Sequence, residues 1–301
     1  MPATLQSPKK APAKRPLQPN VVNVVLGNLA IKPWFPSFYP KEQVEGDRLE
    51  RLYVCQWCFK YTHEIMKYCA HCKVCPQQQE PVGDSIYEKD GYAIHELDGE
   101  EHKMYAQNLS LFAKLFLDTK SVFFDVSSFL YYTLVSKQAG EEGQVVGFFS
   151  KEKMSWDNNN VACILVFPPW QRKGLGQILM GASYELGRRE DRFGGPERPL
   201  SGPGQRGYTT FWCGEVCRHI LRTPAKKTVT IKDISDATWI LPDDIILALK
   251  EMDVYEQRKA GGILIHKSKV RAWAEQHGVS KESPVDVGAF IDMAYETGSE
   301  S

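Results

Sequence analysis

The sequence lacks an excess of charge of either sign. Its 37 lysines and arginines balance 37 aspartates and glutamates, so the formal net charge at pH 7 is zero. Such a chain has no overall basic field of the kind that holds nucleic acid, so any contact with DNA would be local or made by a partner. The sequence also has no apolar run close to the roughly 20 residues that cross a bilayer, and its basic, proline-rich beginning is unlike a signal peptide. We therefore expect no membrane association.

The cysteines lack the spread that a disulfide framework would need. Of eight cysteines, five fall between Cys55 and Cys75, a pattern typical of a metal site in a reducing compartment. Cys55 and Cys58 form a C-x-x-C pair, and after a gap of twelve residues His71 and Cys75 form an H-x-x-x-C pair. Two close pairs of nitrogen and sulfur ligands, about a dozen residues apart, suit a tetrahedral structural zinc.

The same segment allows a second set of ligands. Cys72 and Cys75 form another C-x-x-C pair, and Cys69 precedes them. Four cysteines bind zinc as well as three cysteines and a histidine do. The spacing alone therefore leaves both sets open.

The segment 161–176 predicts a strand, a basic turn and a helix in succession. Residues 161–167 are a short apolar run with β-branched and aromatic side chains, which indicates a buried strand. Pro168 and Pro169 end it, because proline cannot continue a ladder. The turn Gln171-Arg172-Lys173-Gly174-Leu175-Gly176 follows, and then apolar residues recur at helical spacing. These residues are Ile178, Leu179, Ala182 and Leu186.

This succession makes an anion-binding site. The first amides of a helix have no partner within the helix, and the helix dipole favours a negative charge there. Gly174 and Gly176 let a ligand approach the backbone closely, and Arg172 and Lys173 add positive charge. The turn matches neither the Walker loop nor the G-x-G-x-x-G fingerprint. A diphosphate group is the ligand that we expect there.

The remaining segments predict a chain of mixed helices and strands. Residues 1–20 are basic and rich in proline, which is typical of a disordered tail. We expect a Gly/Glu-rich turn at 137–143, a polar loop at 156–160, and a loop dense in glycine and proline at 192–207. The predicted strands are 21–26, 53–54, 86–89, 92–97, 121–126, 129–135, 145–150 and 262–266. The predicted helices are 108–118, 231–237, 242–252 and 268–277.

Three stretches carry a resemblance to a known family. NVACILVFPPWQRKGLG, SYELGRRE and GGPERPLS closely resemble the MYST family of histone acetyltransferases, and the likeness runs from about Val21 to about Glu296. It implies an α+β fold with a GNAT-like acyl-CoA N-acyltransferase core. An N-terminal zinc finger and β region would occupy residues 21–83, the acetyl-CoA-binding catalytic core 84–220, and a helix-turn-helix-like, winged-helix-like segment 221–296. In this family the last segment is scaffold, which makes DNA reading by it the weaker interpretation.

The resemblance assigns roles to site residues. The finger of this family, C-x-x-C-x12-H-x3-C, selects Cys55, Cys58, His71 and Cys75 as ligands of a structural Zn²⁺. The family's loop G-S-P-E-K-P-L-S makes Glu197 the general base, although Gly195 replaces the usual serine and Arg198 the usual lysine. Glu185, on the predicted helix, is the competing carboxylate, with a structural or surface role. Cys163 matches the active-site cysteine, which either carries the acetyl group transiently or lines the site.

The resemblance also places acetyl-CoA. Backbone contacts of the strand would hold the pantetheine arm, the basic turn the pyrophosphate, and two hydroxyl residues further parts of the molecule. The implied contacts are Ile164, Leu165, Val166, Arg172, Lys173, Gly174, Leu175, Gly176, Gln177, Ser201 and Thr210. Lys120 aligns with a lysine that family members acetylate on themselves, but Thr119 before it replaces the usual histidine.

We therefore expect a nuclear lysine acetyltransferase that acts on the histone H4 tail of nucleosomes. The short chain without an N-terminal chromodomain resembles the fungal "something about silencing" (SAS) branch, which acts in gene silencing as part of a small chromatin-modifying complex. The essential MYST branch with a truncated chromodomain is a second enzyme interpretation. A catalytically weak scaffold subunit with a zinc finger and a winged helix is the alternative from another class. Cys163, the turn QRKGLG and Glu197 argue against it.

Overall fold

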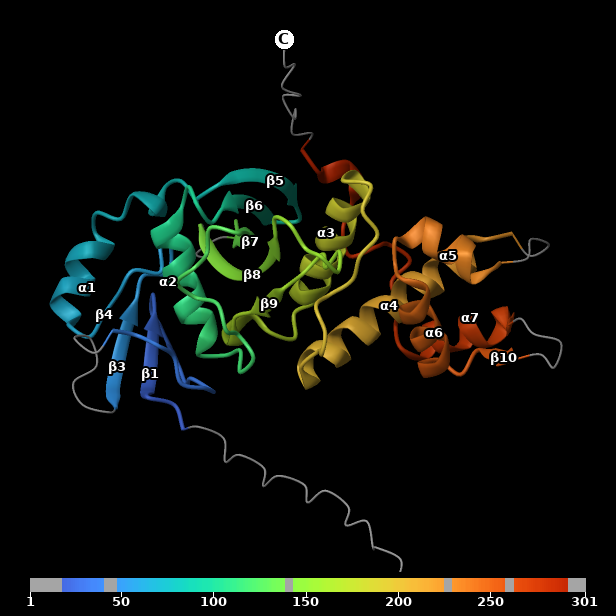
Figure 1. The fold of residues 1–301 in the computed structure, drawn as a ribbon, viewed down its shortest axis with the longest axis horizontal. Helices are drawn as coiled ribbons and strands as arrows, with labels where there is room; N and C mark the ends of the chain where they lie inside the picture. Colours follow the sequence, from blue (N-terminus) through green and yellow to red (C-terminus); the bar gives the residue numbers. More distant parts are fainter. Residues whose placement is uncertain (1–17, 41–47, 139–142, 225–228, 258–262, 292–301) are drawn as a thin grey trace, which may run out of the picture.

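The computed structural model describes residues 18–40, 48–138, 143–224, 229–257 and 263–291. Along the long axis of the molecule, an N-terminal β region, a central sheet and a C-terminal group of helices follow one another (Figure 1). This mixed arrangement confirms the expected α+β class. Most of the predicted N-terminal tail, part of the turn at 137–143 and the last residues of the predicted C-terminal segment lie outside the described residues.

The strands form three sheets within the described residues. The N-terminal sheet has the order β2-β1-β3-β4, the central sheet β5-β6-β7-β8-β9, and a small sheet pairs β10 with β11. The strands are β1 Val21–Leu26, β2 Leu29–Ile31, β3 Leu49–Val54, β4 Tyr61–Thr62, β5 Asp84–Lys89, β6 Tyr92–Asp98, β7 Phe129–Ser136, β8 Gln144–Glu152, β9 Cys163–Val166, β10 Tyr255–Gln257 and β11 Ile263–Ile265.

The helices flank the central sheet and build the C-terminal group. They are α1 Ile65–Cys72, α2 Lys103–Lys114, α3 Leu175–Arg189, α4 Gly202–Arg222, α5 Ile231–Thr238, α6 Pro242–Glu251 and α7 Lys267–Gln276, with short 3₁₀ turns at Pro76–Gln78, Pro168–Trp170 and Val287–Ala289. No helix in the described ranges has the length and apolar character that a membrane crossing requires.

The central sheet is an antiparallel meander in which each strand pairs with the next along the chain. The hairpin of β5 and β6 turns at Asp90 and Gly91, which both have positive φ values of 51° and 78°. This pair of residues favours such a turn, as the sequence predicted. β9 ends the sheet: in the part of the chain that the structure describes, its only ladder partner is β8. One edge of β9 is therefore left for other contacts.

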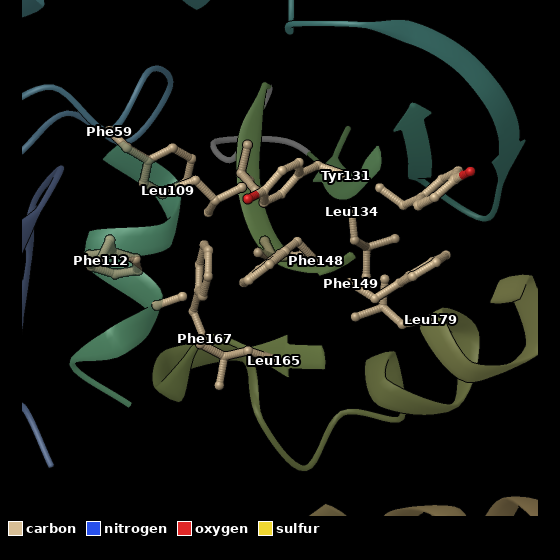
Figure 2. Close-up of a cluster of buried hydrophobic side chains, with 14 of the residues drawn as sticks. Phe59, Leu109, Phe112, Tyr131, Leu134, Phe148, Phe149, Leu165, Phe167 and Leu179 are labelled. Atoms are coloured by element: carbon tan, nitrogen blue, oxygen red, sulfur yellow. The ribbon is translucent and has the colours of Figure 1, made fainter. Parts of the chain in front are cut away.

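Two hydrophobic clusters hold the molecule together. The larger one joins the N-terminal region to the central sheet, and its centre packs Phe59, Phe112 and Phe167 against one another and against β7 and β8 (Figure 2). The smaller one lies mainly among α4, α5, α6 and α7 and takes Met180 and Tyr184 from α3. Since α4 belongs to the smaller cluster and runs to Arg222, it crosses the domain boundary expected at 220/221. That boundary stays a prediction.

Two predicted elements differ near α2. The helix predicted at 108–118 spans Lys103–Lys114 instead, because Tyr105 and Ala106 are buried and extend its apolar face toward the N-terminus. It ends early because the carbonyl of Leu115 accepts from the amides of Trp34 and Phe35, at 2.8 and 3.0 Å. That capture takes the Leu115 carbonyl out of the helix.

The strand predicted at 121–126 is wrong. In place of a ladder, the Phe123 ring stacks on Phe38 at 4.8 Å, and the Phe124 carbonyl accepts from the side chain of Gln107 at 2.7 Å. Contacts with side chains thus hold this segment in place of a strand partner, and it runs as an irregular connection into β7.

The central strand and the following loop also differ from expectation. The strand predicted at 161–167 is confined to Cys163–Val166 and is half-buried, since it lies at the edge of the sheet. The loop predicted at 192–207 ends at Ser201, whose side chain caps α4 by accepting from the amide of Gly204 at 3.2 Å. Pro203 fits the first turn of a helix, where its missing N–H costs nothing. The sequence did not predict this helix start, because the three glycines of GPGQRG are typical of a loop.

Candidate active site

The predicted strand, turn and helix are present at the end of the central sheet. β9 leads through the turn Pro168–Trp170 to Gln171, whose side chain donates to the carbonyl of Val166 at 2.8 Å. Arg172 and Gly174 both have positive φ, at 62° and 82°. α3 then begins at Leu175, with Gly174 as its N-cap residue in the left-handed conformation. The glutamine side chain thus ties the turn to the end of the strand.

The backbone of this turn is open to a ligand. A Cβ built on Gly174 would meet nothing within 4 Å, and a Cβ on Gly176 would meet only the Val166 Cγ2 atom, at 3.9 Å. Arg172 and Lys173 are exposed beside it. The N-terminal amides of α3 therefore face an accessible and positively charged cradle, of the kind that receives a diphosphate.

The edge of β9 continues this cradle. Ile164 and Val166 are half-buried and Leu165 is buried, and on one side they pair with residues of β8. The opposite edge of the strand has no ladder partner among the described residues. An extended ligand with amide groups can therefore pair with it as a further strand would.

The start of α4 lies next to the start of α3. The side chain of Gln177 in α3 donates to the carbonyl of Gly207 in α4 at 3.3 Å. Ser201 is exposed at the N-cap of α4, and Thr210 is exposed two turns further on, its hydroxyl donating to the carbonyl of Arg206 at 2.9 Å. Residues 202–207 spell G-x-G-x-x-G, but they lie inside α4 and do not follow a strand, so they lack the context of a dinucleotide fingerprint.

Cys163 has a neighbour that its sequence surroundings did not indicate. The Nζ atom of Lys120 lies 3.8 Å from the Sγ atom of Cys163, across 43 positions of the chain. Lys120 is only 6% exposed, so its ammonium is held against the thiol. Burial raises the pKa of the nearby Tyr131 to about 12, although its hydrogen bond with Ser110 opposes the shift. The side chains of Lys120 and Tyr131 are thus both neighbours of Cys163.

Glu197 lies on a loop that pairs with the segment before β9. Pro196 forms a parallel bridge with Val161, and the Glu197 amide donates to the Val161 carbonyl at 2.8 Å. The Asn160 amide donates to the Gly195 carbonyl at 2.9 Å. Glu197 is exposed. These contacts bring the backbone of Glu197 beside the entry to β9, two residues before Cys163.

The competing carboxylate is engaged elsewhere. Glu185 is 8% exposed in α3, and its Oε1 atom accepts from the Nε atom of Arg189 at 3.0 Å. Arg188 lies 3.8 Å from its other oxygen. Since both arginines belong to the same helix, these contacts are those of a structural side chain.

The cysteine-rich segment brings four ligand atoms together. The Sγ atoms of Cys55, Cys58 and Cys75 and a ring nitrogen of His71 all lie within 4.8 Å of one another. A tetrahedral zinc with Zn–S bonds of about 2.3 Å places two sulfurs about 3.8 Å apart, and the Sγ atoms of Cys55 and Cys75 are 3.8 Å apart. The four residues therefore fit a zinc ion. This group does not include Cys69, which is exposed in α1.

Comparisons with known proteins agree with this geometry. The chain matches the MOZ/SAS family over residues 80–289 and the MYST family zinc finger domain over residues 18–75. It is 40% identical over 243 residues to the histone acetyltransferase MOF of Drosophila melanogaster. The aligned region covers 81% of this chain and 29% of that protein. It is 37% identical over 259 residues to the histone acetyltransferase Tip60 homolog of Caenorhabditis elegans, covering 84% and 55%. The chain thus spans about half or less of the length of these relatives.

Proposed function

The chain belongs to the MOZ/SAS family of MYST histone acetyltransferases, and on that premise we propose that it transfers an acetyl group from acetyl-CoA to a histone lysine. The observation that carries this proposal is the joining of three features at one end of the central sheet. They are the open cradle before α3, the free edge of β9, and the loop that brings Glu197 to the same strand. The zinc-finger match supports the same family assignment.

The reaction needs a base at this place. A free lysine has a pKa of about 10.4, so about one amine in a few thousand is neutral near pH 7, and only the neutral amine attacks. The carboxylate of Glu197 takes a proton from the amine as its nitrogen bonds to the thioester carbonyl carbon. The C–S bond then breaks, and the CoA thiolate leaves and takes up a proton. A base in this position contributes roughly 10²–10⁴-fold to the rate.

The cofactor residues divide by the part of acetyl-CoA that they meet. The edge of β9, with Ile164, Leu165 and Val166, holds the pantetheine arm. The turn and the first residues of α3 hold the pyrophosphate through backbone amides and through the charges of Arg172 and Lys173. Ser201 and Thr210 contact the molecule from α4, which the bond from Gln177 to Gly207 keeps close to α3.

Cys163 lines the acetyl-transfer site, and direct attack with Glu197 as the base is the route that we propose. The Nζ atom of Lys120 lies 3.8 Å from the sulfur of Cys163, and a cysteine that carries the acetyl group is the competing route. Lys120 is also the residue that we propose for autoacetylation. Acetylation there removes the positive charge beside Cys163, and mass spectrometry of the protein after incubation with acetyl-CoA tests it.

Zinc has a structural role in this proposal. Cys55, Cys58, His71 and Cys75 fill all four tetrahedral positions, which leaves no open position for substrate. The ion would fasten α1 and the segment after it to the N-terminal sheet. Catalysis then depends on zinc only through folding.

The finer assignments rest on the resemblance of the sequence to the family. We propose that the substrate is the histone H4 tail in nucleosomes, that the protein works in the nucleus as a subunit of a small chromatin-modifying complex, and that it belongs to the SAS branch. The relatives compared are named as histone acetyltransferases, which supports a histone as the substrate.

Mass spectrometry of nucleosomes tests the proposal. Recombinant nucleosomes are incubated with the purified protein and acetyl-CoA, and in parallel with the Glu197→Gln variant. We expect new acetyl groups on H4 tail lysines with the natural sequence and a strong loss with the variant. Acetylation of another histone would overturn the choice of H4, and no acetylation by the protein alone or with its native partners would overturn the enzyme assignment.

A further inference from the structure

We propose that the ion pair between Arg198 and Asp244 is a positioning device, which holds Glu197 in place from the C-terminal group of helices. This inference rests on the proposed function, in which Glu197 is the base. It assigns a part in the reaction to α6, which lies outside the acetyl-CoA cradle. The side chain of Asp244 is almost fully buried, so the role that we assign to it is to position another residue.

Glu197 is fastened on both sides. On the N-terminal side, Pro196 bridges to Val161, and the amide of Glu197 donates to the Val161 carbonyl at 2.8 Å. On the C-terminal side, an Nη2 atom of Arg198 donates to the Oδ1 atom of Asp244. The first anchor ties the loop to the entry of β9, and the second ties it to α6. The backbone that carries the base is therefore held between two separate parts of the fold.

Asp244 is a buried residue at the start of α6. Its side chain is 3% exposed, whereas that of Arg198 is 48% exposed. It occupies the first turn of α6, where a negative charge is favoured, and its amide donates to the carbonyl of Leu241 at 3.0 Å. Burial raises the pKa of Asp244, and the guanidinium of Arg198 opposes that shift. A buried carboxylate of this kind needs its cation.

The carboxylate also lies close to the loop on the other side of Glu197. A Cβ on Gly195 would lie 3.5 Å from the Oδ2 atom of Asp244, and this oxygen has no hydrogen-bond partner among the described residues. The side chain of Asp244 thus pairs with the residue after the base and lies close to the residue two positions before it. The Arg198 guanidinium also lies over the ring of Trp212 in α4, 5.6 Å from its centre.

The ring of Trp212 is itself fixed. Its Nε1 atom donates to the hydroxyl of Tyr184 at 2.8 Å, and both side chains are buried. The guanidinium of Arg198 therefore packs on a ring that a hydrogen bond between α3 and α4 holds in place. This guanidinium thus has two neighbours, the carboxylate of Asp244 and the ring of Trp212.

The test compares four variants in acetyl transfer to a histone H4 tail peptide. They are Arg198→Met, Asp244→Asn, Arg198→Lys and, as a matched control, Asp243→Asn, which changes the exposed neighbour of Asp244 in the same turn. We expect Arg198→Met and Asp244→Asn each to lower kcat about tenfold, because small displacements of a reacting group cost this much or more. The KM for acetyl-CoA should stay within about twofold. Arg198→Lys should recover most of the rate, and Asp243→Asn should keep all of it.

A combined variant separates positioning from general damage. If the pair acts through Glu197, adding Arg198→Met to Glu197→Gln lowers kcat no further. A further loss would overturn the inference, and so would a raised peptide KM in Arg198→Met alone, because that would mean direct contact with the peptide. Calorimetric titration with acetyl-CoA gives the fraction of each variant that is folded and binds acetyl-CoA, and kcat is calculated per mole of that fraction. An unchanged rate in Glu197→Gln would instead refute the part of the proposed function on which this inference rests, namely that Glu197 is the base.

Discussion

Replacing Gly176 by alanine should stabilise the fold and weaken acetyl-CoA binding at the same time. Gly176 is the second residue of α3 and does not have the positive φ of Gly174. A methyl group there would meet only Val166 Cγ2, at 3.9 Å. Alanine is favoured over glycine in a helix by about 1 kcal/mol in the interior, so about half of that is expected near the end. The free energy of unfolding should therefore rise slightly.

The same methyl group would stand where the diphosphate approaches the backbone. The loss of one hydrogen bond to a charged group costs about 1.5–3 kcal/mol, which corresponds to a dissociation constant about 10- to 150-fold higher. Isothermal titration calorimetry with acetyl-CoA measures this change, and urea denaturation measures the stability. Unchanged acetyl-CoA affinity in Gly176→Ala would refute the placement of the ligand.

Gly181→Ala is the matched control in the same helix. A Cβ on Gly181 would lie 2.9 Å from the Cγ2 atom of Val285, and such overpacking costs about 1–3 kcal/mol. This variant should lose stability and keep its affinity for acetyl-CoA. The two variants therefore separate binding from folding, because only Gly176→Ala should weaken acetyl-CoA binding, while the two should change the free energy of unfolding in opposite directions.

Three further predictions concern the zinc group, the loop and the cysteine. Metal analysis should show about one zinc per chain, and Cys55→Ser should leave insoluble or misfolded protein, because structural zinc contributes on the order of 10 kcal/mol to small finger folds. The control Cys69→Ser should fold and bind zinc as the natural protein does. A stable, active, metal-free protein would contradict the assignment. Gly195→Ser should raise the free energy of unfolding above that of Gly195→Ala by about 1 kcal/mol, because the hydroxyl can donate to the free oxygen of Asp244; equal stability in urea would show that this bond does not form. Cys163→Ala should keep most of the acetyl-transfer rate, and a loss as deep as that of the base variant, with a thioester on Cys163, would favour the acetyl carrier.

Local patterns in the sequence predicted the parts of the site that are continuous in the chain. Paired prolines after an apolar run, and glycines before a helical pattern, place the turn between β9 and α3 where the structure has it. The hairpin at Asp90-Gly91 was predicted for the same reason. These signals act over a few residues, where steric limits on the backbone decide the conformation.

The parts that the sequence could not predict depend on distant contacts. Lys120 meets Cys163 across 43 positions, and Arg198 meets Asp244 across 46. No spacing rule covers such pairs, because the fold alone brings them together. The start of α4 was not predicted for another reason. Gly202 and Pro203 are typical of a loop, although a proline after a serine cap is also typical of the start of a helix.

The most direct measurement is the rate of acetyl transfer to a histone H4 tail peptide by the natural protein and by Glu197→Gln, from pH 7 to pH 9. We predict transfer by the natural protein and a rate lower by about 100-fold or more in the variant at pH 7. The deficit should narrow toward pH 9, because the neutral fraction of the lysine amine rises about 100-fold over this range. No transfer by the natural protein, or a variant with a near-normal rate at every pH, would contradict the account.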